Sequence, residues 1–360
     1  MSKYKVTVYA ICKNEEEKIK VWYNSMKEAD EIIVLDTGST DKSLSILKKL
    51  PKIKVYQEKI IPWRFDVARN LSLSYVSKDT DICICTDIDE RFEAGWRNTL
   101  EKYWTPSYTR AKYLYNWSFD NQGKPGTTFY LNKIHNRTDY KWINPVHEVL
   151  KSNKEEKEIL IPGIVLNHYQ DITKARTSYL PLLELAVKEN PNDDRNIHYL
   201  GREYMYYKKW DKCIETLHNH LKLQNATWKD ERSASMRYIA YSYYNKKYLE
   251  ESIMWYKLAI QEAPYLREPY FDLGYLYYQE KDYINSEHYL KKALKIKDKS
   301  LTYINEEKAW NETIYDILSL SCFYNKKYKE SLRYIKKALK LNNQDERLNQ
   351  NYLYIKKYAI

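Results

Sequence analysis

The hydrophobic pattern of this chain changes near residue 170, and this change limits the folds that it can adopt. Before that point, short apolar runs alternate with polar segments that have the length of helices. After about residue 175 the pattern is helical, and small residues recur at regular intervals. We therefore predict an α/β domain over residues 1–172 and an all-α repeat domain over residues 173–360.

The first domain shows the alternation that is typical of a mostly parallel sheet covered by helices. Strands are expected at residues 6–12, 31–35, 53–57 and 82–85, and helices at residues 15–27 and 41–50. Tryptophans and short strand-like runs between residues 111 and 135 indicate a mixed, partly antiparallel extension.

The second domain repeats a pattern of small residues. The first small residue of each repeat is Gly201, Ala240, Gly274 or Ser319, so neighbouring repeats are 39, 34 and 45 residues apart. Nineteen positions later stand His220, Ala259, Ala293 and Ala338, of which His220 departs from the pattern. Small residues at these positions let paired helices approach closely. We expect about four helix-turn-helix repeats and a capping helix from about residue 345.

Composition limits the classes of protein to which this chain can belong. The apolar content of 43% is enough for real cores, and no apolar run approaches the roughly 18 residues that span a bilayer. The first ten residues lack a secretory signal, and the five cysteines lack a zinc-type spacing. These features predict a cytoplasmic protein with reduced thiols. The net charge of +11 leaves nucleic acid, an acidic acceptor or an anionic membrane as partners, although the scattered lysines also fit a general composition bias.

Three carboxylates, Asp87, Asp89 and Glu90, follow the fourth strand directly. Open α/β sheets bind ligands at the C-terminal edge of their strands. Asp87 and Asp89 can hold a divalent cation through their oxygens, and such a cation can neutralise a diphosphate. A solvated acidic turn explains the same residues equally well, so the interpretation depends on what else lies at this edge.

Polar residues also follow the other strands. Asn14 and Glu15 come after the first strand, where Asn14 could cap a helix. Asp36 ends the second strand, has no capping duty there, and could accept a hydrogen bond from a nucleobase. Asp41 is better explained as a helix cap. Arg69 could pair with a phosphate or with the nearby carboxylates, and a surface salt bridge explains it as well.

A last cluster contains Trp142, His147 and Glu148, and His168 follows later. Both histidines are candidate metal ligands, and Glu148 is a candidate general base. A lone histidine on a strand is, however, more often an ordinary core or surface residue than a ligand. Trp142 could stack on a sugar face or could belong to the core.

Taken together, the clusters resemble family 2 glycosyltransferases in their order and spacing. The residues that carry this resemblance are 14–16, 36–41, 68–70, 87–90, Trp142 and 147–148. The fold that it implies is GT-A, a nucleotide-sugar-binding sheet. The repeats resemble tetratricopeptide repeats, most closely around Leu273, Gly274 and Tyr277. The combination resembles a subgroup that includes the bacteriocin S-glycosyltransferases.

The resemblance implies a role for each site residue. Asp36 would contact a uracil-type base, and Arg69 would lie near the phosphates. Mn²⁺ or Mg²⁺ would be held by Asp87, Asp89 and His168. Glu148 would deprotonate the acceptor, which implies an inverting displacement. The remaining donor-binding residues would be Asn14, Glu15 and Trp142. This chain departs from many relatives in carrying Ile88, rather than a small residue, between the two aspartates.

The expected activity is that of a hexosyltransferase. It would move a sugar from a nucleotide sugar, such as UDP-glucose, to a peptide, protein or other extended acceptor docked on the repeats. A second interpretation makes modified bases of nucleic acid the acceptor, as in phage genomes. A third makes the chain a non-catalytic repeat scaffold with a degenerate transferase domain.

Overall fold

The computed structural model describes residues 3–120, 122–170 and 178–359. The chain divides into two compact units, one of residues Met1–Glu189 with Leu301–Tyr303 and one of residues Asn190–Ser300 with Ile304–Ile360. The boundary expected at residues 172/173 lies outside the described residues and stays a prediction. No helix within the described ranges combines the length and apolarity needed to cross a membrane.

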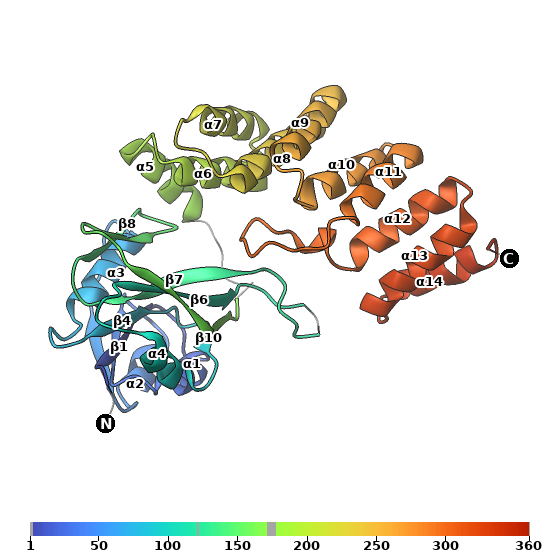
Figure 1. Cartoon of the computed structure of the whole chain (residues 1–360). Helices are drawn as coiled ribbons and strands as arrows, with labels where there is room; N and C mark the ends of the chain where they lie inside the picture. The colour runs from blue at the N-terminus through green and yellow to red at the C-terminus, as the bar shows by residue number, and fades with distance from the viewer. Residues whose placement is uncertain (1–2, 121, 171–177, 360) are drawn as a thin grey trace. The chain divides into compact units, whose positions relative to one another are not determined.

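The described part of the first unit is built around an eight-stranded sheet (Figure 1) with the order β3-β2-β1-β4-β7-β6-β10-β5. Its strands are β1 (Val6–Cys12), β2 (Glu31–Asp36), β3 (Ile53–Gln57), β4 (Ile82–Cys85), β5 (Glu90–Phe92), β6 (Arg110–Asn116), β7 (Thr128–Asn136) and β10 (Glu158–His168). The strands β3, β2, β1 and β4 are parallel, whereas β7 runs antiparallel to β4 and β6. These pairings confirm the mostly parallel α/β fold with a partly antiparallel extension.

Helices cover both faces of this sheet because alternate side chains of each strand point to opposite sides. On one face, Val8 packs with Trp22, in a core formed with α1 (Ile19–Met26), α2 (Ser43–Leu47) and α4 (Trp96–Tyr103). On the other face, Tyr9 packs with Leu73 of α3 (Phe65–Ser74) and with the hairpin of β8 (Tyr140–Ile143) and β9 (Val149–Ser152) (Figure 1). Each fully buried large side chain contributes about 1.5–3 kcal/mol to folding. The helix α5 (Tyr179–Glu189) ends this unit.

The first helix begins later than the expected residue 15, at Ile19. The backbone amides of residues 15 and 16 are bound by side chains at the start of α2 and in the loop before it, so the chain first makes a turn. Ser43 Oγ accepts from Glu15 N at 2.7 Å, and Asp41 Oδ2 accepts from Glu16 N at 3.1 Å. The interpretation of Asn14 as a helix cap is therefore wrong.

Three of the polar clusters meet at one edge of the sheet because their strands are parallel. Cys12 of β1 pairs with Asp36 of β2, and Tyr9 pairs with Cys85 at the end of β4. The chain leaves β1 toward β2 and β3 on one side and returns as β4 on the other. Such a reversal of strand order is where open α/β sheets form ligand crevices.

The described part of the second unit consists of helices stacked in antiparallel pairs (Figure 1). The pairs are α6 (Asp194–Tyr206) with α7 (Trp210–Lys222), α8 (Lys229–Asn245) with α9 (Leu249–Glu262), α10 (Glu268–Gln279) with α11 (Tyr283–Ala293), and α12 (Glu312–Tyr324) with α13 (Tyr328–Leu341). The last helix, α14 (Glu346–Lys356), packs on α13. This arrangement confirms the all-α repeat region.

The small residues allow close contact inside each pair. A Cβ atom added at Gly201 would lie 2.3 Å from Cδ2 of Leu217, and one added at Gly274 would lie 2.8 Å from Cγ of Leu290. Gly274 also faces the Leu290 backbone nitrogen, at 3.2 Å from the added atom. Neither helix can therefore accept a larger residue at this position without moving its partner.

We expect Gly274→Ala to lower the free energy of unfolding by about 1–3 kcal/mol, because it overpacks the contact with Leu290. Urea unfolding monitored by circular dichroism measures the change. The double variant Gly274→Ala/Leu290→Ala is the control, and its loss should be smaller than the sum of the two single losses. Additive losses would show that the two residues do not interact in this way.

Candidate active site

The acidic loop after β4 directs its carboxylates outward because the residue between them is anchored. The side chain of Ile88 is 2% exposed and packs in the core on the α1 face. Asp87 and Asp89 flank it, and their side chains are 35% and 21% exposed. Ile88 thus serves as an apolar anchor for the loop.

The buried side chain of Glu90 stabilises this loop through hydrogen bonds. Its Oε2 accepts a hydrogen bond from Asp87 N at 2.8 Å, and its Oε1 accepts one from the hydroxyl of Tyr115 at 2.9 Å. Lys133 of β7 places its Nζ 3.4 Å from both Asp87 Oδ2 and Glu90 Oε1. Burial raises the pKa of Glu90, although the charge of Lys133 opposes the rise. Glu90 is 1% exposed, so it supports the loop rather than facing a ligand.

The structure brings Asp89 and His168 together. His168 ends β10, opposite Glu90 of β5, and its Nε2 lies 3.5 Å from Asp89 Oδ2. Its Nδ1 lies 3.1 Å from the carbonyl oxygen of Trp117, which can only accept a hydrogen bond. The proton therefore belongs on Nδ1, and Nε2 faces the aspartate. This is how a second partner commonly orients a metal-binding histidine.

Burial would lower the pKa of His168, but the hydrogen bond and charge of Asp89 outweigh this effect and raise it. Asp89 therefore favours the protonated form of His168.

The guanidinium group of Arg69 connects Asp87 with Glu148. Arg69 lies on α3, is 5% exposed, and donates through Nη2 to Asp87 Oδ1 at 2.8 Å. Its Nε donates to Glu148 Oε1, and Nη1 donates to Cys85 Sγ at 3.2 Å. The side chain of Glu148 is 10% exposed. One buried guanidinium thus holds the end of β4 and the loop between β8 and β9 in a fixed relation.

Positive charge dominates the electrostatics of Asp87. Burial would raise the pKa of this carboxyl, but the charges of Arg69 and Lys133 outweigh burial and hold it below its ordinary value. Asp87 is therefore ionised at neutral pH, which is the form that binds a cation.

The loop after β2 contains a buried acceptor that lacks a partner among the described residues. Asp36 is 1% exposed, and its Oδ1 accepts from the amides of Gly38 at 3.1 Å and Ser39 at 3.0 Å. Its Oδ2 is buried and accepts no hydrogen bond from the described residues. Asn14 braces the same loop, because its Oδ1 accepts from Thr40 N at 2.8 Å. Glu15 lies beside the loop through its amide contact with Ser43.

Trp142 lies in the core rather than at an open face. It is 2% exposed, its indole donates to Tyr9 Oη at 2.9 Å, and its ring lies 5.1 Å from the guanidinium carbon of Arg69. Asn70 holds its backbone through two hydrogen bonds, at 2.8 Å and 2.9 Å. Of the two roles open to Trp142, the core position fits this structure and stacking on a sugar does not, and the ring supports Arg69 instead.

Two exposed aromatic residues were missed by sequence reasoning. Trp117 follows β6, is 40% exposed, and its ring lies 4.5 Å from that of His168. Tyr169 follows β10, is 43% exposed, and stacks with Arg91 at 4.0 Å. Lys133 was also missed, because its approach to Asp87 depends on β7 pairing with β4, which no local motif signals. For Trp117 the signal was present, since it belongs to the tryptophan-rich extension.

Several solved structures are similar to the repeat region. A thermophilic tetratricopeptide-repeat protein of Thermus thermophilus is 22% identical, with coverage of 49% of this chain and 88% of the other and a TM-score of 0.36. PilF of Pseudomonas aeruginosa is 11% identical, with coverage of 49% and 72% and a TM-score of 0.38. Part of a repeat-containing protein from Cytophaga hutchinsonii is 15% identical, with coverage of 51% and 66% and a TM-score of 0.42. With TM-scores below 0.5, these likenesses carry no conclusion about this chain.

Family models match both parts of the chain. Residues 7–160, which include the sheet edge with Asp36, Asp87 and Glu148, match glycosyl transferase family 2. Residues 268–300, which include α10 and α11, match the tetratricopeptide repeat. The first match supports a glycosyltransferase activity for residues 7–160, and the second supports tetratricopeptide repeats in the C-terminal region.

Proposed function

We propose that this glycosyltransferase uses a divalent metal ion to move a sugar from a UDP-sugar, such as UDP-glucose, to a peptide or protein, with inversion at the anomeric carbon. The observation that carries the proposal is the pair of Asp89 and His168 beside Asp87. A neutral imidazole nitrogen and two ionised carboxylates form a donor set that suits a divalent cation. This set lies at the sheet edge where a nucleotide is expected.

The residues fit the metal that the family commonly uses. Asp87, Asp89 and His168 would hold Mn²⁺ or Mg²⁺, and the mixed oxygen and nitrogen set favours Mn²⁺. When bound, the ion would stabilise the negative charge of the departing nucleoside diphosphate. The hydrogen bond from His168 Nδ1 to Trp117 keeps Nε2 available for this ligand role.

The buried carboxylate of Asp36 favours the assignment of a uracil-type base to the donor. A buried carboxylate oxygen without a partner is costly unless a ligand supplies a donor, and the imide N–H of uracil is such a donor. Asn14 keeps the loop around Asp36 in place through Thr40. Arg69 acts on the donor indirectly, because Asp87 and Glu148 already occupy its guanidinium.

We assign the general base to Glu148. Arg69 binds both Glu148 and Asp87, so the base is held close to the residue that would bind the metal and the donor diphosphate. A base held beside the donor diphosphate can reach the hydroxyl or thiol of an acceptor, as a direct displacement at the anomeric carbon requires. Catalytic hydrogen bonds often form fully only with substrate bound, so the pairing with Arg69 is compatible with this role.

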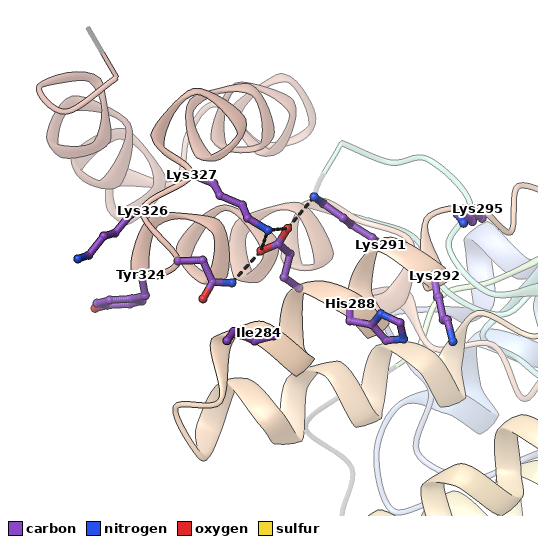
Figure 2. Close-up of a pocket in the computed structure, with 10 residues that line it drawn as sticks. Ile284, His288, Lys291, Lys292, Lys295, Tyr324, Lys326 and Lys327 are labelled. Atoms are coloured by element: carbon purple, nitrogen blue, oxygen red, sulfur yellow. Dashed lines mark hydrogen bonds and ion pairs between the residues drawn. The ribbon is translucent and has the colours of Figure 1, made fainter.

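The repeats offer a surface for an acidic extended acceptor. A pocket of about 770 Å³ lies between α11 and the turn after α12, and Lys292, Lys295 and Lys326 line it (Figure 2). Within the described residues these three lysines have no carboxylate partner, whereas Lys291 and Lys327 are paired with the buried Glu287. Positive charge without a partner fits acidic side chains of a docked peptide.

The proposal is tested with a panel of nucleotide sugars and Mn²⁺, with nucleotide release as the measurement. We expect one UDP-sugar to be turned over and chelation to stop the reaction. We expect Asp89→Asn to lower kcat/KM at least about 100-fold, because it weakens the charge opposite the diphosphate. The control is Asp79→Asn, which changes an exposed carboxylate that is paired with Lys5. Unchanged turnover in Asp89→Asn would contradict the metal assignment.

A separate measurement tests Glu148. We expect Glu148→Gln to lower the rate of transfer to the acceptor about 10²–10⁴-fold, because the amide cannot take the acceptor's proton. Binding of UDP should be retained, since the amide oxygen can still accept from Arg69. The exposed Glu155→Gln is the matched control. Full transfer by Glu148→Gln would mean that another residue is the base, and salt-sensitive retention of DNA would favour the nucleic-acid acceptor instead.

A further inference from the structure

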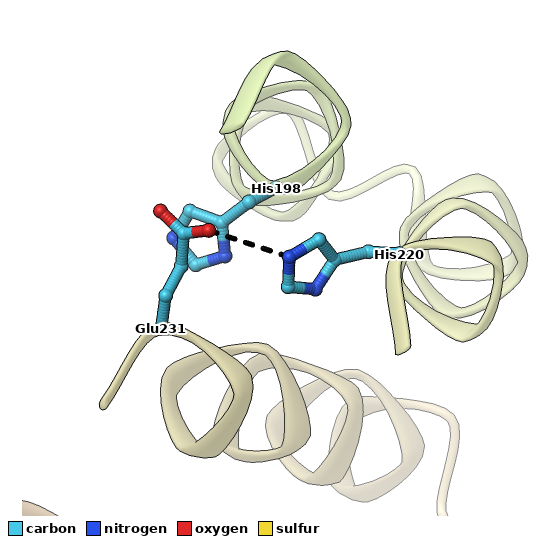
Figure 3. Close-up of side chains that lie close together, drawn as sticks. All are labelled: His198, His220 and Glu231. Atoms are coloured by element: carbon cyan, nitrogen blue, oxygen red, sulfur yellow. Dashed lines mark ion pairs between the residues drawn. The ribbon is translucent and has the colours of Figure 1, made fainter. Parts of the chain in front are cut away.

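The first repeat and the helix after it share a buried polar cluster that the proposed glycosyltransferase reaction does not use. His198 of α6, His220 of α7 and Glu231 of α8 point toward one another (Figure 3). One ligand atom from each residue lies within 4.8 Å of the others, and His220 Nε2 lies 3.3 Å from Glu231 Oε1. The two histidines are 0% exposed and Glu231 is 3% exposed.

The repeats that follow carry no histidine at the positions equivalent to His198 and His220. The position of His220 is occupied by Ala259, Ala293 and Ala338, all fully buried. Three positions before the first small residue, where His198 stands, the later repeats carry Arg237, Phe271 and Asp316, which are 2%, 3% and 5% exposed. An alanine therefore suffices at the position of His220 in the later repeats, and the imidazole there requires a different reason.

The hydrogen bonds of the cluster leave Nε2 of each histidine without a hydrogen-bond partner among the described residues. Ser235 Oγ lies 2.8 Å from His198 Nδ1 and 3.0 Å from His220 Nδ1. Nε2 of His198 is buried and has no hydrogen-bond partner among the described residues. With protons on both Nδ1 atoms, Ser235 accepts both hydrogen bonds and leaves both Nε2 atoms as ligands.

We propose that His198, His220 and Glu231 bind Zn²⁺, which ties α6, α7 and α8 together. Two imidazoles and a carboxylate are a common zinc set. In a tetrahedral zinc site with bonds of about 2.0–2.1 Å, neighbouring ligand atoms lie roughly 3.3 Å apart. The 3.3 Å between His220 and Glu231 matches such an edge, so a small movement of His198 completes the set. This zinc site is distinct from the metal site proposed for the glycosyltransferase domain, whose ligands include two carboxylates.

The test measures zinc in the full chain after removal of metals by a chelator, titration with Zn²⁺ and desalting. An Asp89→Asn background weakens binding at the glycosyltransferase site, so the retained ion reports on the repeats. We expect one equivalent of Zn²⁺ per chain in this background, a Zn²⁺-dependent rise in Tm, and the visible bands of tetrahedral Co²⁺ when Co²⁺ replaces zinc.

His220→Ala in the same background should lose the equivalent, the rise in Tm and the cobalt bands. This variant introduces the residue of the other three repeats, so it should fold, and His198→Phe is a second variant built on the same reasoning. Ser235→Ala should weaken binding about 10–100-fold. The control is His218→Ala, on the same helix but in contact with Trp255 at 5.0 Å.

The proposal is overturned if the Asp89→Asn chain retains no zinc, because the cluster is then a hydrogen-bonded part of the core. It is equally overturned if His220→Ala and His198→Phe, checked by circular dichroism, retain the same equivalent.

Discussion

The buried guanidinium of Arg69 is the interaction on which the active-site edge depends. It binds Asp87 at the end of β4 and Glu148 in the loop between β8 and β9. Removing one partner of such a buried ion pair usually costs about 3–5 kcal/mol, because the remaining charge has no compensation. Asn70, one residue along, fixes the backbone of Trp142, whose ring packs against Arg69. The helix α3 thus connects the two segments that carry the proposed metal ligand and the proposed base.

Much of the first unit could be predicted because strand periodicity and chain direction determine it. The strands expected at residues 6–12, 53–57 and 82–85 are found with these bounds, and the parallel sheet aligns Asp36 with the end of β1. Local sequence patterns did not predict the surroundings of residues that are positioned by tertiary contacts. The sequence alone is compatible with either a surface or a core position for Trp142, and the packing of β8 on α3 decides between them. Lys133 contacts Asp87 because β7 pairs with β4, which is a long-range contact.

The helix after β1 shows the same limit. Helix propensity placed its start near residue 15, but Ser43 and Asp41 bind the amides of residues 15 and 16 from the start of α2 and the loop before it. In the repeats, the small residues predicted the close pairing of helices, which Gly201 and Gly274 show directly. The same pattern singled out His220 as a departure, yet its neighbours His198 and Glu231 come from other helices and carry no repeat signal. Repeat periodicity therefore indicates where a site departs from ordinary packing, and the fold is needed to show what surrounds it.

The central claim is that the edge formed by Asp87, Asp89 and His168 binds a metal together with the diphosphate of the donor. Electron paramagnetic resonance of Mn²⁺, titrated with the protein in the presence and absence of UDP, measures this directly. We expect UDP to tighten Mn²⁺ binding, and His168→Ala to weaken the UDP-dependent binding at least about tenfold, or roughly 1.4 kcal/mol. Mn²⁺ affinity that is the same with and without UDP, and the same in His168→Ala, would contradict the account.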